Sequence, residues 1–159
     1  MRLILAAVGR MKKGPEQELC NRYLERARAG ARHAGFSAIE LREIPESPAR
    51  DAGARAAAEA KALLAATAPG ARLALLDERG KPLNSKEFTA EISTARDMAC
   101  DIVLALGGPD GHGREIRERA DLIISFGAMT WPHQLARIMA AEQIYRATTL
   151  LTGHPYHRG

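Results

Sequence analysis

Apolar residues along this chain fall into short runs separated by longer amphipathic stretches. Four largely apolar runs predict buried strands, at residues 2–8, 71–76, 102–106 and 122–125. Residues 36–44 alternate apolar and polar side chains, which is typical of a strand nearer a sheet edge. Helical spacing between these segments predicts helices over about 15–33, 50–66, 84–99, 114–119 and 132–149.

Strands that alternate with helices predict an α/β fold with a mostly parallel sheet and helices on both faces. The segment ERGKP at residues 78–82 is expected to form a turn, and Asn84 with Glu87 resembles a capping box. The alanine-rich helix near 50–66 is expected to lie largely on the surface. No repeat or linker interrupts the pattern, so residues 1–159 are expected to form a single domain.

The last predicted helix is apolar on two sides. Leu135, Ile138 and Met139 form one face, and Ala136, Ala140, Ile144 and Ala147 form the other. A helix that is buried on both sides needs two partners. We therefore expect it to pack on its own sheet and on another subunit.

Composition places the chain among ordinary globular proteins, with 46% apolar and 26% charged residues. The first apolar run precedes its charges, so we interpret it as a strand and not as a signal peptide. Cys20 and Cys100 lie far apart with no CxxC motif, which favours reduced thiols in a cytoplasmic protein. No membrane span is expected. A net charge of +4 is a mild indication of a polyanionic partner.

The segment DIVLALGGPDGHG, residues 101–113, runs from a strand into a glycine-rich loop. Such turns in open α/β sheets let the backbone approach a ligand closely. The loop lacks GxGxxG, and a Walker A alignment places Arg114 and Glu115 where Lys and Ser/Thr are needed. A phosphate loop is therefore disfavoured, while a structural turn without a ligand stays open. The apolar, glycine-bearing loop 126–131 suits an adenosine better than a triphosphate.

Residues 152–159 form a tail that concentrates chemistry-bearing side chains: His154, Tyr156, His157 and Arg158. The spacing HxxH is compatible with a metal, but no third ligand lies nearby in the sequence and Pro155 disfavours a helix. The set suits RNA better, because Tyr stacks on bases, Arg contacts anionic groups and His exchanges protons. Four arginines on the first predicted helix, at positions 22, 26, 28 and 32, fit either a solvated face or an RNA-facing stripe.

Several of these motifs together resemble one family. The segments LALGGPDGHG, TWPH at 130–133, EQIYRA at 142–147 and HPYHR at 154–158 are similar to those of the SPOUT superfamily, and within it of the small methyltransferases of large-subunit ribosomal RNA. The resemblance covers the whole chain. It implies a trefoil knot in roughly residues 102–150, S-adenosylmethionine as methyl donor and a homodimer. It further implies methylation of N3 of a pseudouridine in 23S ribosomal RNA on assembled 70S ribosomes.

Carried over by position, the resemblance assigns donor contacts and catalytic residues without a metal. The donor contacts are Leu76, Gly107, Phe126, Gly127, Ala128, Met129, Thr130 and Trp131. The tail is expected to reach the partner protomer's donor site, where His154 or His157 accepts the N3 proton, Arg158 stabilises the anion and Tyr156 holds the base. The family usually has small and apolar residues such as Leu-Ser in the loop where this chain has Phe126-Gly127 and Trp131, and main-chain contacts to adenine should survive that change.

Two other functions fit part of the pattern. A non-catalytic RNA-binding ribosome factor of the same fold would keep the basic surface and lose donor binding. A nucleotide-binding α/β protein would bind ATP or NAD instead. Affinity for S-adenosylmethionine distinguishes both from the methyltransferase.

Overall fold

The computed structural model describes residues 1–157, in which strands and helices alternate as predicted. In chain order the elements are β1 (Arg2–Val8), α1 (Pro15–Gly30), β2 (Ala38–Ile44), α2 (Ala52–Ala65), β3 (Arg72–Pro82), α3 (Ser85–Asp97), β4 (Ile102–Leu106), α4 (Arg114–Arg119), β5 (Leu122–Ser125) and α5 (His133–Thr152). Asn84 and Glu87 form the expected capping box at the start of α3. None of the helices in the described part of the chain is long and apolar enough to cross a membrane.

The strands form a parallel sheet in the order β2-β1-β4-β3-β5. The alternating strand β2 lies at an edge, as its pattern predicted. Because all pairings are parallel, the carboxyl ends of the strands meet at one edge of the sheet, where open α/β folds bind their ligands.

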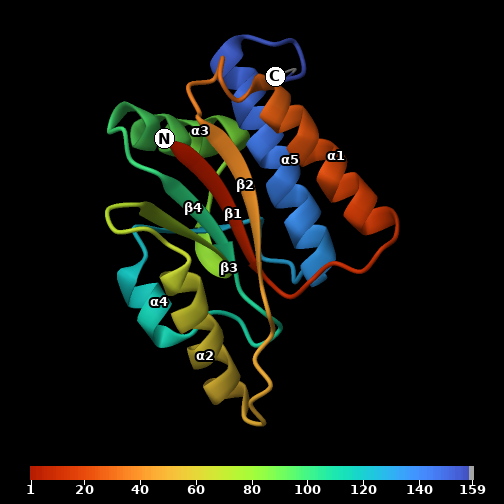
Figure 1. Cartoon of the computed structure of the whole chain (residues 1–159), viewed down its shortest axis with the longest axis vertical. Coiled ribbons are helices and arrows are strands. Elements are labelled where there is room, and N and C mark those ends of the chain that lie inside the picture. The colour runs from red at the N-terminus through yellow and green to blue at the C-terminus, as the bar shows by residue number, and fades with distance from the viewer. Residues whose placement is uncertain (158–159) are drawn as a thin grey trace.

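Helices cover both faces of this sheet, as Figure 1 shows. In β1, Leu3, Leu5 and Ala7 face one layer, which is built with α1, α3 and α5. The intervening residues of β1 face the other layer, where Ala60 and Leu63 of α2 and Ile116 of α4 pack against them. A strand with two apolar faces is fully covered in this arrangement. The predicted α/β fold with helices on both faces is confirmed.

The turn predicted at residues 78–82 is wrong, because β3 continues to Pro82. The strand shifts register between Leu76 and Lys81 and then pairs again with β5. Gly80 permits the close approach, since a Cβ there would lie 2.4 Å from the carbonyl carbon of Ile124. Charged and glycine residues favour a turn locally, but pairing with a neighbouring strand decides the conformation here.

The burial of two helices tests the sequence predictions. The helix α2 lies largely on the surface, as expected, and buries one face through Ala56, Glu59, Ala60 and Leu63. The helix α5 contacts α1, α3 and β1, so neighbours within the chain already cover much of its surface. Leu135 stays 43% exposed on α5, on one of the two apolar faces that the sequence predicted. The expected second subunit stays a prediction.

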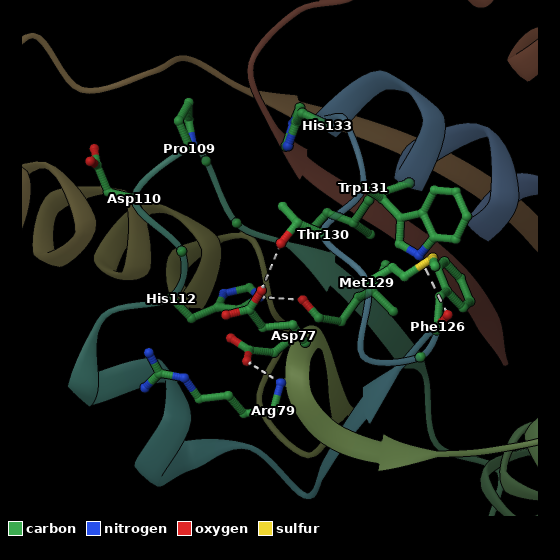
Figure 2. A pocket seen from close by; sticks show the side chains of 18 of the residues that line it. Asp77, Arg79, Pro109, Asp110, His112, Phe126, Met129, Thr130, Trp131 and His133 are labelled. Atoms are coloured by element: carbon green, nitrogen blue, oxygen red, sulfur yellow. Dashed lines mark hydrogen bonds between the residues drawn. The ribbon is translucent and has the colours of Figure 1, made fainter.

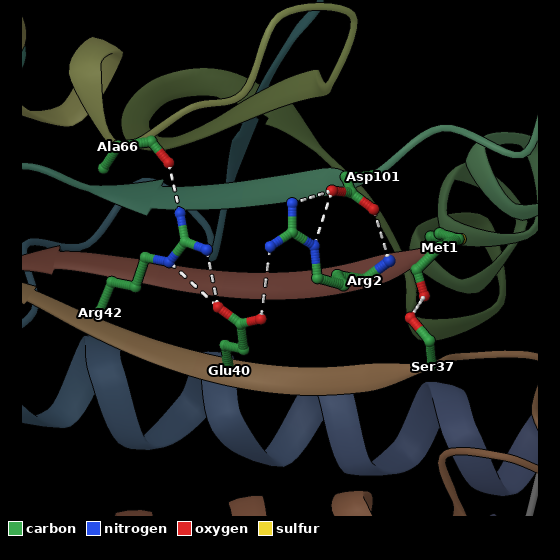
Figure 3. A network of polar contacts seen from close by, with 7 residues as sticks. All are labelled: Met1, Arg2, Ser37, Glu40, Arg42, Ala66 and Asp101. Carbon is green, nitrogen blue, oxygen red and sulfur yellow. Dashed lines mark hydrogen bonds and ion pairs between the residues drawn. The ribbon is translucent and has the colours of Figure 1, made fainter.

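Polar contacts join the strands at the opposite, amino edge of the sheet (Figure 3). Arg2 at the start of β1 donates from Nε and Nη2 to Asp101, which precedes β4, at 2.9 and 2.7 Å. Glu40 of β2 lies between Arg2 and Arg42, and its carboxylate pairs with both guanidinium groups. This network holds β1, β2 and β4 together at the amino edge, opposite the edge where the carboxyl ends of the strands meet.

Candidate functional site

A cavity of about 460 Å³ lies at the carboxyl end of β4, beside the middle of β3. Figure 2 shows its lining, which comes from the middle of β3, the glycine-rich loop after β4, and the loop between β5 and α5. The volume lies within the range that small-molecule sites occupy. Three segments that are distant in sequence therefore build one concave site at the ligand-binding edge of the sheet.

Most of the predicted donor contacts line this cavity. They are Leu76, Gly107, Phe126, Gly127, Met129, Thr130 and Trp131. Ala128 belongs to the same loop but is not among the lining residues. The structure thus brings the segments together, while the role of each residue in binding stays a prediction.

Close packing of its own backbone shapes the glycine-rich loop. A Cβ on Gly107 would lie 2.9 Å from the carbonyl oxygen of Gly111, which is closer than real side chains permit. At the tip, Asp110 accepts a hydrogen bond from Nε of Arg55 in α2 at 2.7 Å. Hydrogen bonding to Arg55 lowers the pKa of Asp110. Glycine and this ion pair therefore fix the loop against the sheet and α2.

A buried carboxylate lies directly behind this loop. Glu59 of α2 is 3% exposed, and a Cβ on Gly108 would lie 2.6 Å from its Oε2. Its Oε1 accepts a hydrogen bond from the backbone N–H of Ser47 at 2.9 Å. A negative charge held at the back of the loop would repel phosphate. This observation agrees with the exclusion of a phosphate loop from the sequence.

The floor of the cavity holds three polar side chains that sequence reasoning did not assign. The imidazole Nε2 of His112 lies 3.0 Å from the carbonyl oxygen of Leu76. The carboxylate of Asp77 is ion-paired with Arg117 of α4, and Arg117 also donates from Nε to the carbonyl of His112 at 3.1 Å. These contacts tie β3, the glycine-rich loop and α4 to one another beneath the cavity.

The loop between β5 and α5 forms an apolar rim. Met129 is 72% exposed and Trp131 is 41% exposed. Trp131 donates from Nε1 to the carbonyl of Phe126 at 3.4 Å, and the Thr130 hydroxyl donates to Glu78 at 3.5 Å. Large exposed apolar side chains beside a cavity are typical of a surface that a ligand or partner covers.

A second polar cluster fixes the start of α5 beside the cavity. His133 lies 2.6 Å from the carbonyl oxygen of Val8, at the end of β1. The buried guanidinium of Arg137 donates to the carbonyls of Val8 and Gly9 and pairs with Glu43 at 2.8 Å. The PH motif identified the position of His133, but the pairing of Arg137 with a residue far away in sequence had no local signal.

The described part of the tail, residues 152–157, lies away from this cavity in the same chain. Tyr156 packs against Tyr145 with ring centroids 4.6 Å apart, and its hydroxyl donates to Glu142 of α5 at 3.0 Å. Burial and this hydrogen bond raise the pKa of Tyr156 to about 12, so the phenol stays protonated near neutral pH. The ring lines a second cavity, of about 880 Å³, beside α1, α3 and α5. Arg158 lies outside the described residues.

Both tail histidines use Nδ1 as an acceptor. His154 Nδ1 accepts from the backbone N–H of Tyr156 at 3.2 Å, and His157 Nδ1 accepts from Nη1 of Arg146 at 3.2 Å. A neutral imidazole with Nδ1 as acceptor carries its proton on Nε2. In this position of the tail, neither residue presents a free lone pair, so a role as proton acceptor requires the tail to move.

Comparison with known proteins gives consistent matches over the whole length. A family described as predicted SPOUT methyltransferase matches residues 1–157. Proteins named ribosomal RNA large subunit methyltransferase H are similar to the chain. The one from Methylocella silvestris is 58% identical over 159 residues, covering 99% of both chains, and that from Nitrobacter hamburgensis is 50% identical over 160 residues, covering 100% of both.

Among solved structures, the chain is similar to the SpoU methyltransferase AviRb from Streptomyces viridochromogenes in complex with its cofactor AdoMet. The identity is 13% and the TM-score is 0.39, with 92% of this chain and 57% of that chain covered.

Proposed function

We propose that this chain, which belongs to the SPOUT methyltransferase family, transfers the methyl group of S-adenosylmethionine to 23S ribosomal RNA of the large subunit. The observation that carries the proposal is the cavity between the carboxyl end of β4 and the middle of β3, where the segments expected to contact the donor meet. The high identity to proteins named for this activity supports the substrate class.

The residues around the cavity fit the donor. Gly107 and Gly108 line the cavity with main chain, and the close packing around them excludes a side chain, because a Cβ would clash with Gly111 or with Glu59. Phe126, Met129 and Trp131 supply apolar surface for the base, and the volume of about 460 Å³ is sufficient for a ligand of this size. The buried Glu59 behind the loop disfavours the triphosphate of a rival nucleotide.

The acceptor is N3 of a pseudouridine. Bound S-adenosylmethionine supplies an electrophilic methyl group on a sulfonium sulfur. The tail residues hold the base and promote loss of the N3 proton, so that the N–C bond forms as the C–S bond breaks. N3 lies between two carbonyls, and its delocalised anion needs positive neighbours more than a strong base. Arg158 supplies that charge, and His154 or His157 accepts the proton after the tail has left its position on α5.

The active form is a homodimer in which the tail of each protomer completes the donor site of its partner. In a single chain the ring of Tyr156 lies beside α5, in a cavity other than the donor cavity. Phe126 and Gly127 line both cavities, so the donor loop separates them. The exposed Leu135 provides apolar surface near the start of α5 for a partner.

The substrate is the assembled 70S ribosome in the cytoplasm. Arg22 and Arg26 on α1 and Arg32 just after it are exposed and are available to contact RNA phosphates. Arg28 donates to the carbonyl of Ile39 at 3.0 Å and thus has a structural contact as well. The net charge of +4 favours such a polyanionic partner.

Calorimetric titration tests the donor site and separates the enzyme from a non-catalytic RNA-binding factor. We expect S-adenosylmethionine to bind once per protomer, while ATP and NAD give no heat of binding at the same concentrations. The donor titration detects the cavity directly, without RNA or ribosomes. A protein that binds ribosomes but gives no donor binding would be the non-catalytic factor, and binding of ATP or NAD would favour a nucleotide-binding protein.

A further inference from the structure

His112 joins two of the segments that form the donor cavity. Its side chain is buried, with the residue 9% exposed, at the end of the glycine-rich loop (Figure 2). Nε2 lies 3.0 Å from the carbonyl oxygen of Leu76. A carbonyl oxygen only accepts hydrogen bonds, so Nε2 carries the proton and donates. The imidazole therefore ties the loop to β3 at Leu76.

The other ring nitrogen has no hydrogen-bond partner within the described residues. Nδ1 of His112 is buried, and it lies 3.2 Å from the point that a Cβ on Gly107 would occupy. In the neutral ring Nδ1 carries a lone pair and no hydrogen, so the ring fits beside Gly107. Protonation would place a charged N–H at this point with no acceptor, which is costly in a buried site. The geometry therefore accommodates the neutral imidazole and disfavours the imidazolium.

Two charged groups from neighbouring elements face the ring. Burial lowers the pKa of His112 below its usual value, and the nearby guanidinium of Arg117 in α4 lowers it further. The hydrogen bond to Leu76 and the carboxylate of Asp77 in β3 act in the opposite direction, but burial is the larger effect. Asp77 and Arg117 are ion-paired with each other, so their opposite effects on the pKa of His112 partly offset each other.

We infer that His112 is a positioning residue of the donor site, and that its neutral imidazole holds the Leu76 carbonyl and the Gly107 backbone in the arrangement that binds the donor. Protonation adds a buried N–H at Nδ1 beside Gly107, where the described residues offer it no acceptor. This disturbs the arrangement and weakens donor binding. This inference rests on the proposed function, because Leu76 and Gly107 are proposed donor contacts. His112 acts through them and does not touch the reacting atoms.

The direction of the pH effect follows from the lowered pKa of His112. The neutral ring predominates above the ordinary histidine pKa of about 6.5. As the pH falls below that value and through the lowered pKa of the folded protein, the ring takes up a proton and donor affinity falls. The affinity for S-adenosylmethionine is therefore highest at neutral and alkaline pH and decreases at acidic pH.

Two substitutions separate the hydrogen bond from the titration. His112→Gln places an amide nitrogen near the position of Nε2, so it retains a donor for the Leu76 carbonyl but does not titrate. His112→Leu fills similar space with neither property. We expect His112→Gln to bind S-adenosylmethionine within about threefold of the unmodified protein near neutral pH, and His112→Leu to bind about three- to tenfold more weakly.

The decisive measurement is the affinity for S-adenosylmethionine by calorimetry between about pH 7.5 and pH 5.0. We expect the unmodified protein to lose at least about threefold more affinity than His112→Gln over this range. Comparison of the two proteins at each pH cancels every effect of pH that the two proteins share, including titration of the donor itself. Equal loss in both proteins would overturn the inference.

Thermal unfolding in the same buffers keeps the result interpretable. We expect all three proteins to be folded at the temperature of the titration, and His112→Gln to lose less stability than the unmodified protein at acidic pH. Equal acid sensitivity of stability in these two proteins would also contradict the inference. Absence of donor binding by the unmodified protein near pH 7.5 would instead refute the proposed donor site, so the two failures are distinguishable.

Discussion

Deletion of residues 154–159 is expected to abolish methylation and to leave donor binding almost intact. The deleted residues supply the proposed proton acceptor and the charge for the N3 anion, and general acid–base groups contribute about 10²–10⁴-fold to rates. Among the described residues of the tail, 152–157, none lines the donor cavity, so its affinity for S-adenosylmethionine should change by less than about twofold. Single-turnover methylation of ribosomes and calorimetry measure the two quantities separately.

A shorter truncation controls for the end of α5. The backbone N–H of His154 donates to the carbonyl of Thr149 at 2.9 Å and so closes the helix after Gly153. A protein that ends at His154 keeps this bond and should be as inactive as the longer deletion. Methylation at the normal rate by either truncated protein would show that the tail has no catalytic role.

Mixing two impaired proteins tests whether the tail acts on the partner's site. In a mixed dimer, the tail of a Gly107→Val protomer, which binds the donor weakly, can enter the intact cavity of a truncated protomer. At a donor concentration too low to load Gly107→Val, co-refolding of the two proteins should therefore give more activity than the two proteins give separately. No recovery, with mixed dimers present by native mass spectrometry, would contradict the tail exchange.

Gly107→Val is expected to weaken donor binding by at least about tenfold, equivalent to about 1.4 kcal/mol. The first atom of the side chain would lie 2.9 Å from the Gly111 carbonyl oxygen and 3.2 Å from Nδ1 of His112. The loop must therefore open or shift, and overpacking of this kind costs about 1–3 kcal/mol. Because the crowding is with the loop itself, the variant should also lower the midpoint of thermal unfolding.

A second glycine provides the control for this variant. Gly70 has a positive φ of 78° and lies in the turn before β3, where a Cβ would meet no atom within 4 Å. Gly70→Ala should cost about 1–2 kcal/mol of stability through backbone strain and leave donor affinity unchanged. If Gly107→Val binds the donor as tightly as Gly70→Ala, the loop does not form the donor site.

Apolar patterning predicted the sheet well because its strands are buried on both faces. Residues 3–8 of β1 and all of β4 are apolar and are buried between two helical layers. The extension of β3 to Pro82 was not predictable in the same way. Its charged residues have no strand pattern, and only the approach of β5 to Gly80 explains the conformation.

The donor cavity was predictable from motifs, whereas its supporting contacts were not. The glycine-rich loop, Leu76 and the loop 126–131 were each identified along the chain, and they line one cavity. The sequence left open whether Asp110 and His112 do more than shape the turn. Asp110 pairs with Arg55 and His112 with Leu76, and both partners lie more than thirty residues away. Contacts at such separation depend on the fold and leave no local pattern.

The resemblance to the SPOUT family is confirmed by the match over residues 1–157. The trefoil knot, the homodimer and the roles of the tail stay predictions. The position of Tyr156 on α5 was not expected from the sequence, because a terminal segment has no periodicity that indicates where it docks.

The most direct test of the account is mass spectrometry of 23S ribosomal RNA from cells with and without this protein. We predict one additional methyl group on N3 of a single pseudouridine when the protein is present, and its loss when the gene is deleted. Purified protein with S-adenosylmethionine should restore the methyl group on 70S ribosomes from the deleted strain. Identical RNA masses in the two strains, or a methyl group on a different nucleotide, would contradict the proposed function.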